Sequence, residues 1–289
     1  MNRSRTAKGK GKPLAGRVVA ITGGARGIGK ATAAALAHRG CAVAIGDLDL
    51  EEAERTAVEL GSPCLALSLD VTDRGSFEAF LAQVEERLGP VDVLINNAGI
   101  MVLSEFDLED DATTQRSLDI NLGGVMLGTK LAMASMKARG QGQIINIASQ
   151  AGKVGFAGAV TYTTSKFAVV GLCEAARAEL AGTGVNVSCV MPAVVDTELG
   201  SGLTQPRGLP SLQPEDVAEA IVEAIESERF EVWVPRYSRG IVLGTSLLPR
   251  RVSEMISRAI GADRVLSDAD KAARDEYERR AGRESELSR

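Results

Sequence analysis

Short apolar runs alternate with longer amphipathic segments along most of the 289-residue chain. The short runs are rich in β-branched residues, as expected for strands that are buried on both faces of a parallel sheet. Seven strands are predicted in this way: Val18–Thr22, Ala42–Ile45, Cys64–Leu67, Val91–Ile95, Ile144–Ala148, Val185–Val190 and Glu231–Val234. Helices are predicted at residues 27–39, 50–60, 73–88, 110–138, 161–182 and 214–228. The alternation predicts an α/β fold, a doubly wound, seven-stranded parallel sheet with helices on both faces.

Small or polar residues follow the carboxyl ends of six predicted strands, where ligands bind in a doubly wound sheet. They are Gly23, Asp47, Asp70, the run Asn96–Gly99, Ser149, and Pro192 with Thr197. A random scatter of polar residues would not fall so regularly at one edge. The sequence therefore predicts one ligand site along this edge of the sheet.

The segment Thr22–Gly29 joins the first strand to the first helix with the spacing Gly-x3-Gly-x-Gly. Glycines at these positions let the backbone turn tightly and approach a pyrophosphate at the helix N-terminus. A glycine-rich packing turn is the alternative. The position directly after the first strand favours a dinucleotide cofactor.

Asp47 ends the second strand, 18 residues after Gly29, where a carboxylate can accept hydrogen bonds from the ribose hydroxyls of adenosine. Its charge would repel a 2′-phosphate, so NAD is favoured over NADP. Arg26 is the competing signal, because its guanidinium could accept that phosphate. The alternative for Arg26 is a solvated loop charge.

Two further segments are assigned to the cofactor. Asp70 with Val71, after the third strand, either frames the adenine or marks the start of a helix. After the fourth strand, Asn97, Ala98 and Gly99 form a turn whose small residues leave room for a cofactor ribose.

Four residues in the middle of the chain indicate alcohol oxidation or carbonyl reduction: Asn121, Ser149, Tyr162 and Lys166. A free tyrosine has a pKa near 10, so only about one in a thousand is ionised at neutral pH. A lysine four residues later on a helix lies on the same face and is expected to lower that pKa by roughly one to three units. Tyr162 is therefore a candidate general base.

These motifs resemble the short-chain dehydrogenase/reductase family, a group of Rossmann-like oxidoreductases, over residues 15–235. The resemblance implies that Tyr162 is the catalytic acid/base and that Ser149 steadies the substrate oxygen. It also implies that Lys166 holds the nicotinamide ribose while lowering the tyrosine pKa, and that Asn121 positions a water in a proton relay. The chain departs from the family pattern in having Pro192-Ala193 in place of Pro-Gly, and in continuing for roughly 54 residues after the last strand.

The motifs and the resemblance together give a cofactor-binding set for NAD. Its members are Gly23, Arg26, Gly27, Ile28, Gly29, Asp47, Asp70, Val71, Asn97, Ala98, Gly99, Tyr162, Lys166, Pro192, Val195 and Thr197.

The expected substrate pocket is mostly apolar, which suits a lipophilic alcohol or ketone of the retinoid, steroid or long-chain alcohol type. Its expected members are Met101, Val102, Gln150, Val154, Phe156, Val194, Val195, Leu199 and Leu203. Residues 194–213 contain several glycines and prolines and are expected to form a mobile lid. Two other functions stay open: an NAD(H)-sensing regulator without turnover, and an epimerase or dehydratase that retains its NAD.

The composition limits the remaining functions and also bears on the location and the domain organisation. The net charge of −5 argues against general nucleic-acid binding. Four dispersed cysteines and a single histidine, His38, predict no metal site and a reducing, cytoplasmic location. Residues 1–14 are expected to be a disordered basic tail, residues 15–235 a single catalytic domain, and residues 236–289 a helical C-terminal extension whose end, from Ser267, is solvated. The extension offers possible peripheral membrane contact, and the family implies a homodimer or homotetramer.

Overall fold

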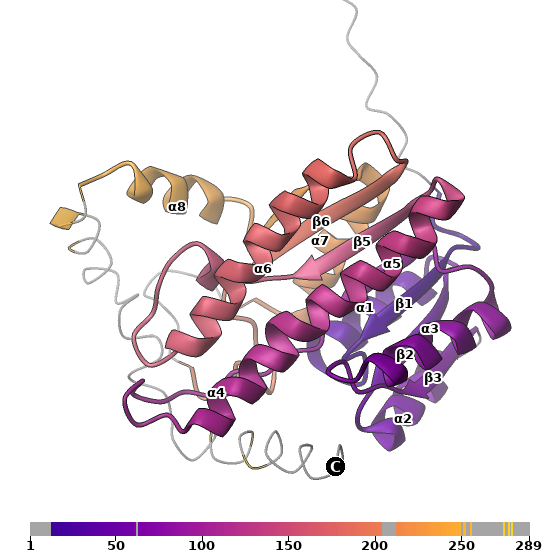
Figure 1. Ribbon diagram of the computed structural model, residues 1–289, viewed down its shortest axis with the longest axis horizontal. Helices are drawn as coiled ribbons and strands as arrows, with labels where there is room; N and C mark the ends of the chain where they lie inside the picture. Colours follow the sequence, from indigo (N-terminus) through magenta and orange to yellow (C-terminus); the bar gives the residue numbers. More distant parts are fainter. Residues whose placement is uncertain are drawn as a thin grey trace, which may run out of the picture.

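A seven-stranded parallel sheet forms the centre of the protein, with strand order β3-β2-β1-β4-β5-β6-β7 (Figure 1). The computed structural model describes residues 13–61, 63–203, 212–249, 251–252, 255, 274, 277 and 279. The strands are β1 (Val18–Thr22), β2 (Ala42–Asp47), β3 (Cys64–Ser68), β4 (Val93–Asn96), β5 (Gly142–Ile147), β6 (Val185–Pro192) and β7 (Glu231–Val234). All seven predicted strands are present, and the predicted fold class is confirmed.

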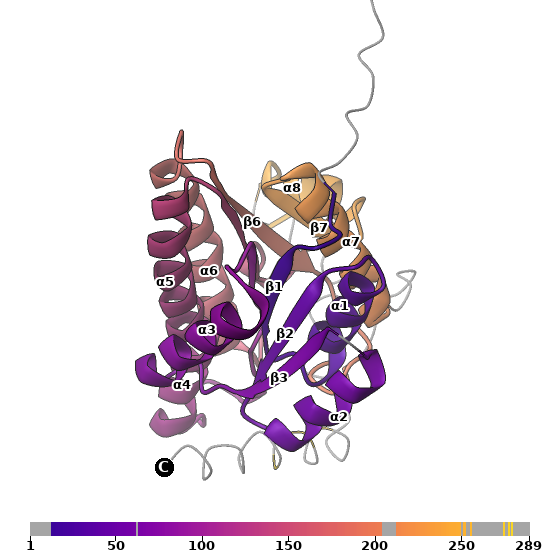
Figure 2. The ribbon, with the colours of Figure 1, turned by 90° about the vertical axis from the view of Figure 1, so that its right-hand side faces the viewer.

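Helices cover both faces of the sheet, as Figure 2 shows edge-on. One face carries α1 (Gly27–Ala37), α2 (Leu50–Leu60) and α7 (Pro214–Ser227). The other carries α3 (Arg74–Leu88), α5 (Val125–Arg139) and α6 (Val160–Glu179), with α4 (Asp111–Leu118) at the N-terminal end of α5. Each face has its own apolar core, and the strand side chains alternate between the two because successive residues point to opposite sides of a sheet.

The predicted helix 110–138 is interrupted. A π-helical segment, η1 (Asp119–Gly124), separates α4 from α5 and contains Asn121. The sequence pattern did not reveal it, because one wide turn changes the apolar period too little to be read over six residues. Gly124 allows the close packing here, since a Cβ at this position would lie 2.8 Å from a side-chain carbon of Val71. Inserted π-turns often occur at functional sites.

The start of the domain that contains the sheet differs from the prediction in one respect. Leu14, assigned to the basic tail, is buried in the core, and its carbonyl accepts a hydrogen bond from Cys41 Sγ. Residues 1–12 lie outside the described residues. His38 caps the C-terminus of α1, as expected from the adjacent Gly40.

After β7 the chain forms α8 (Ser238–Ser246), which extends to one side of the body in Figure 1. Its base is fixed to the domain, because Gln150 Nε2 donates to Ser238 Oγ at 2.7 Å and to Val234 O at 3.0 Å. Among the described helices, none is both long and apolar enough to cross a bilayer.

Candidate active site

Ser149, Tyr162 and Lys166 come together at the carboxyl edge of the sheet. Ser149 follows β5 and begins the short 3₁₀ helix η2 (Gln150–Gly152), where its Oγ accepts a hydrogen bond from Ala151 N at 3.0 Å. Tyr162 and Lys166 lie one turn apart on α6, with Lys166 Nζ 5.6 Å from the centre of the Tyr162 ring. The two hydroxyls of Ser149 and Tyr162 share a hydrogen bond. The sequence prediction that these side chains meet agrees with this geometry.

The pKa of Tyr162 is shifted in the direction opposite to the prediction. Burial of the hydroxyl raises the pKa above that of a free tyrosine, and the hydrogen bond with Ser149 opposes this only in part. The phenol is therefore protonated at neutral pH, which equips it to donate a proton to a carbonyl oxygen.

Lys166 is buried, with 4% of its surface exposed. Its Nζ donates a hydrogen bond to Ile147 O at 3.0 Å, so its ammonium is directed at the end of β5 as well as over the tyrosine ring. Burial lowers its pKa to about 8. The lysine remains largely protonated at pH 7, but at a cost to the folded state.

Asn121 is completely buried, and both ends of its amide bind one backbone residue. Its Oδ1 accepts from Ile100 N at 2.9 Å and its Nδ2 donates to Ile100 O at 2.8 Å. The side chain therefore joins η1 to the segment after β4. A Cβ added to Gly99 would lie 2.9 Å from Asn121 Oδ1 and 3.7 Å from Lys166 Nζ, so this segment passes close to both groups.

The loop between β1 and α1 fits a dinucleotide pyrophosphate. Gly23 and Gly27 have positive φ angles of 63° and 52°, and a Cβ at Gly29 would lie 2.1 Å from Gly23 O. The N-terminus of α1 has no side-chain cap and no acidic residue in its first turn, whereas α2, α3 and α4 are each capped by an aspartate. Uncapped amides at a helix N-terminus favour a bound anion.

Asp47 is placed at the end of β2 as predicted, but its carboxylate also shapes the loop. Its Oδ2 accepts from Ala25 N at 3.0 Å and its Oδ1 accepts from Asp49 N at 3.1 Å. Burial raises the pKa of Asp47, and these two backbone hydrogen bonds counter the effect. The residue thus holds the glycine-rich loop against β2 at the position expected for the adenosine ribose.

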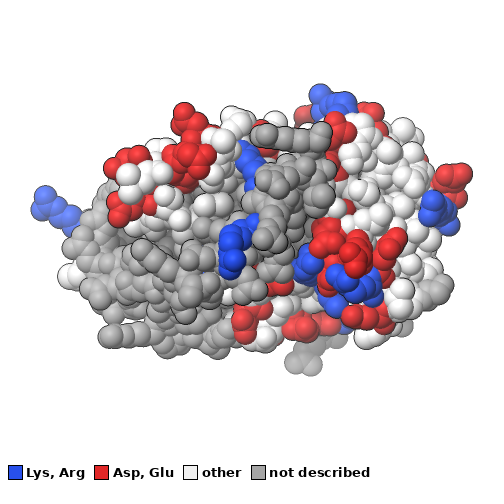
Figure 3. Space-filling model, turned by 90° about the horizontal axis from the view of Figure 1, so that it is seen from below, with Lys and Arg blue, Asp and Glu red and all other residues white. Residues whose placement is uncertain are grey.

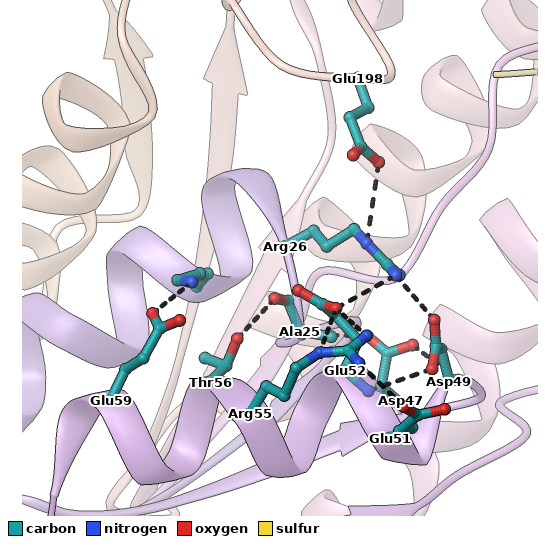
Figure 4. A network of polar contacts seen from close by, with 11 residues as sticks. Ala25, Arg26, Asp47, Asp49, Glu51, Glu52, Arg55, Thr56, Glu59 and Glu198 are labelled. Carbon is teal, nitrogen blue, oxygen red and sulfur yellow. Dashed lines mark hydrogen bonds and ion pairs between the residues drawn. The ribbon is translucent and has the colours of Figure 1, made fainter. Parts of the chain in front are cut away.

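Arg26 is neither free nor simply solvated, because acidic side chains surround it (Figure 4). Its Nη2 lies 2.7 Å from Asp49 Oδ2 and 3.6 Å from Glu52 Oε2, and its Nε lies 3.9 Å from Glu198 Oε2. Seen from below, basic and acidic side chains lie intermixed in one cluster on the surface of the protein (Figure 3). The guanidinium is therefore already neutralised by its neighbours.

Three of the predicted cofactor residues have identifiable structural contacts. Asn97 Nδ2 donates to Gly23 O at 2.8 Å and to Thr22 O at 3.1 Å, so it braces the glycine-rich loop. Asp70 Oδ1 accepts from Thr72 N at 2.9 Å, while the cap of α3 is Asp73, three residues later than the predicted start signal. Val71 is buried against Gly124.

The segment after β6 folds onto the glycine-rich loop. A Cβ at Gly27 would lie 3.3 Å from Thr197 Cγ2, and Pro192 and Val195 are buried nearby along the chain. Asp196 N donates to Leu212 O at 2.8 Å, which brings the two ends of the predicted lid together. Residues 204–211 of that lid lie outside the described residues.

Several residues near the site were missed or misassigned from the sequence. Asn96 does not face the cofactor turn: it is buried, and its Nδ2 donates to Asn146 Oδ1 at 2.8 Å beneath α5. Arg274 and Tyr277, placed in a solvated helix by the charge pattern, are 3% and 9% exposed. No local signal could identify them, because their contacts lie more than 70 residues away along the chain.

A family model described as "short chain dehydrogenase" matches residues 17–208, about two thirds of the chain. The chain belongs to the short-chain dehydrogenase/reductase family. This short-chain dehydrogenase is 39% identical over 191 residues to a sorbitol dehydrogenase from Cereibacter sphaeroides, covering 66% of this chain and 75% of the relative. It is 38% identical over 188 residues to a 3-alpha-(or 20-beta)-hydroxysteroid dehydrogenase from Mycobacterium bovis, covering 64% and 72%.

Among solved structures, a 3-ketoacyl-(acyl-carrier-protein) reductase from Brucella melitensis complexed with NADH aligns with a TM-score of 0.73 at 29% identity. The alignment covers 76% of this chain and 97% of the other. Membership of the family makes this short-chain dehydrogenase an oxidoreductase, and the NADH-bound neighbour supports a nicotinamide cofactor.

Proposed function

We propose that this protein is an NAD-dependent oxidoreductase that interconverts an uncharged, lipophilic alcohol and its ketone or aldehyde. The observation that carries the proposal is the grouping of Ser149, Tyr162 and Lys166 at the edge of the sheet that also carries the uncapped N-terminus of α1. A sensor of NAD(H) would not require a half-buried phenol hydrogen-bonded to a serine and faced by a lysine.

In the reductive direction, Ser149 donates a hydrogen bond to the carbonyl oxygen and Tyr162 transfers its proton to that oxygen. A nicotinamide cofactor held at this site would supply the hydride for the carbonyl carbon. Lys166 places positive charge beside the phenolate that Tyr162 becomes, which stabilises it until a proton returns from solvent. Oxidation is the reverse, with Tyr162 as base.

The glycine-rich loop, with Gly23, Gly27 and Gly29, is assigned to the cofactor pyrophosphate, and Asp47 to the adenosine ribose. Lys166 is assigned to the nicotinamide ribose, as the family resemblance implies, and a Cβ at Gly99 would lie 3.7 Å from its Nζ. Thr197 is assigned to the far side of the cofactor, next to Gly27. These assignments use the residues that the sequence predicted.

The acidic surroundings of Arg26 support NAD over NADP. A 2′-phosphate would approach Asp47, Asp49 and Glu52, and Arg26 is already paired with two of these three carboxylates.

We expect NADH to bind about 100-fold more tightly than NADPH, since like charges at close range cost a few kcal/mol. Asp47→Ala should reduce this ratio about tenfold, measured by fluorescence titration of both cofactors. Glu51→Gln, which removes an exposed carboxylate from the nearby helix α2, is the matched control and should leave the ratio unchanged. Equal affinities in the parent protein would contradict the assignment.

The activity itself is tested by absorbance at 340 nm, with NAD and a panel of primary and secondary alcohols, and with NADH and the corresponding carbonyl compounds. Turnover of lipophilic members supports the proposed substrate class, whereas turnover only of polyols would replace it. If NADH binds and no substrate is turned over, the alternative of an NAD(H)-sensing regulator without turnover is favoured. Tightly retained NAD without net formation of NADH would favour the epimerase or dehydratase.

The oligomeric state of the protein and its location in the cell remain predictions. Met126 on α5 and Phe167 on α6 are 49% and 45% exposed, which supports an apolar contact between copies in a homodimer or homotetramer. Exposed Ile241 and Leu247 beside Arg239 support peripheral membrane contact of an otherwise cytoplasmic protein.

A further inference from the structure

Two residues of the C-terminal extension bind the segments that flank the catalytic group. Arg274 and Tyr277 are three positions apart, and both are helical and buried. The Arg274 guanidinium lies over the Tyr277 ring, 4.7 Å from its centre, which fixes the two side chains relative to each other.

The first segment they bind follows β4. Met101 N donates to Tyr277 Oη at 3.1 Å, and Arg274 Nη2 donates to Met101 O. The Tyr277 ring packs against Ile100. Both backbone groups of Met101 are thus bound by the extension, directly beside the residue that Asn121 holds.

The second segment follows β6. Arg274 Nη1 donates to Leu199 O at 2.6 Å and to Ser201 O at 3.5 Å. The Leu199 side chain packs against the cluster formed by Ile100 and Tyr277. Leu199 is two residues beyond Thr197, which contacts the glycine-rich loop. One guanidinium therefore joins the segment beside Lys166 to the segment beside the cofactor loop.

A charged side chain buried in this way needs hydrogen bonds that offset its lost hydration. Arg274 obtains three from backbone carbonyls, one on the segment after β4 and two on the segment after β6. Lysine could not replace it, because an ammonium lacks the fork that reaches both segments at once.

We propose that Arg274 and Tyr277 are specificity-determining residues that close the substrate side of the site and set an upper limit on substrate length. This rests on the proposed function, since both flanking segments carry residues assigned to the substrate. Arg274 and Tyr277 act through the segments they hold, so the effect falls on KM and on the choice of substrate, while the binding of NADH is unaffected.

The test compares Arg274→Ala, Arg274→Lys and Tyr277→Phe with Arg279→Ala, an exposed position on the same extension. Hydrogen–deuterium exchange of peptides covering residues 97–103 and 197–203 requires no substrate. We expect about tenfold faster exchange in both peptides for Arg274→Ala and in the first alone for Tyr277→Phe. Arg279→Ala should match the parent protein. Because Tyr277→Phe keeps the ring, it preserves the packing if Arg274→Ala proves unstable.

The second arm measures kcat and KM for a series of 2-alkanones of increasing chain length with NADH. For the best ketone, Arg274→Ala should raise KM about tenfold with little change in kcat, and the optimum should move to longer chains. Unchanged exchange in both peptides would overturn the proposal, and so would faster exchange without a change in length preference. If the parent protein reduces no ketone or aldehyde, the proposed function fails, and the exchange measurement alone decides whether the two residues close the site.

Discussion

Replacing Tyr162 by phenylalanine is expected to lower kcat by about three orders of magnitude, because it removes the phenolic proton donor held next to Ser149. The ring remains, so the packing on α6 and the melting temperature should change little. NADH should bind within about twofold of the parent protein, since the phenol contributes one hydrogen bond at most to the cofactor. Single-turnover absorbance at 340 nm separates the chemical step from binding.

Tyr237→Phe is the matched control, because Tyr237 is 49% exposed and lies outside the site. It should retain full activity. Since burial raises the pKa of Tyr162, carbonyl reduction should be insensitive to pH near neutrality and fall only in alkaline solution, whereas alcohol oxidation should rise with pH. Retention of more than a tenth of parental kcat by Tyr162→Phe would remove this residue from the mechanism.

The sheet and the order of the motifs could be predicted because they depend on local patterns. β1 and β7 have the predicted bounds, and the other strands shift by one or two residues at their ends. The residues after β1, β2, β4 and β5 lie at one edge because parallel strands carry their carboxyl ends to the same side. The resemblance added the chemical roles to positions that the alternation alone had already gathered.

The predictions that failed concern groups whose environment is set by distant parts of the chain. The spacing of Tyr162 and Lys166 places them on one helix face, but it does not show that the hydroxyl is enclosed or that Lys166 Nζ is directed to Ile147 O. For Arg26, the alternative of a solvated charge fails because its partners, Asp49 and Glu198, come from the N-cap of α2 and from the segment after β6.

The prediction of one continuous helix through Asn121 and the prediction that Arg274 is solvated failed for different reasons. A six-residue π segment leaves almost no trace in an apolar pattern, since it adds less than one residue to a single turn. Arg274 lies in a run of charges that is typical of a solvated segment, and only its contacts with distant residues such as Met101 and Leu199 show otherwise. Both lie next to segments that carry predicted site residues, and functional sites are where local patterns and the final structure most often disagree.

Replacing Lys166 by methionine should abolish turnover and at the same time stabilise the fold. The lysine pKa of about 8, against an ordinary 10.5, means that folding disfavours the protonated form by about 3 kcal/mol. Methionine fills a similar volume without charge, and it gives up one hydrogen bond to Ile147 O, worth about 1 kcal/mol. The expected net gain is about 2 kcal/mol in the free energy of unfolding at pH 7, measured by urea denaturation.

The sign of the pH dependence distinguishes this origin from better packing. The unfolded chain keeps Lys166 protonated up to its ordinary pKa, whereas the folded protein releases that proton near pH 8, so the parent protein gains stability as pH rises from about 8 to 10.5. The advantage of Lys166→Met should therefore be largest below pH 8 and shrink towards pH 10. Lys153→Met, which removes a lysine paired with Glu174 and Glu231 at the surface of α6 and β7, should show no such trend. An advantage independent of pH would mean that the buried charge is not its cause, and the lysine would then be held in the site without the energetic strain that its burial implies.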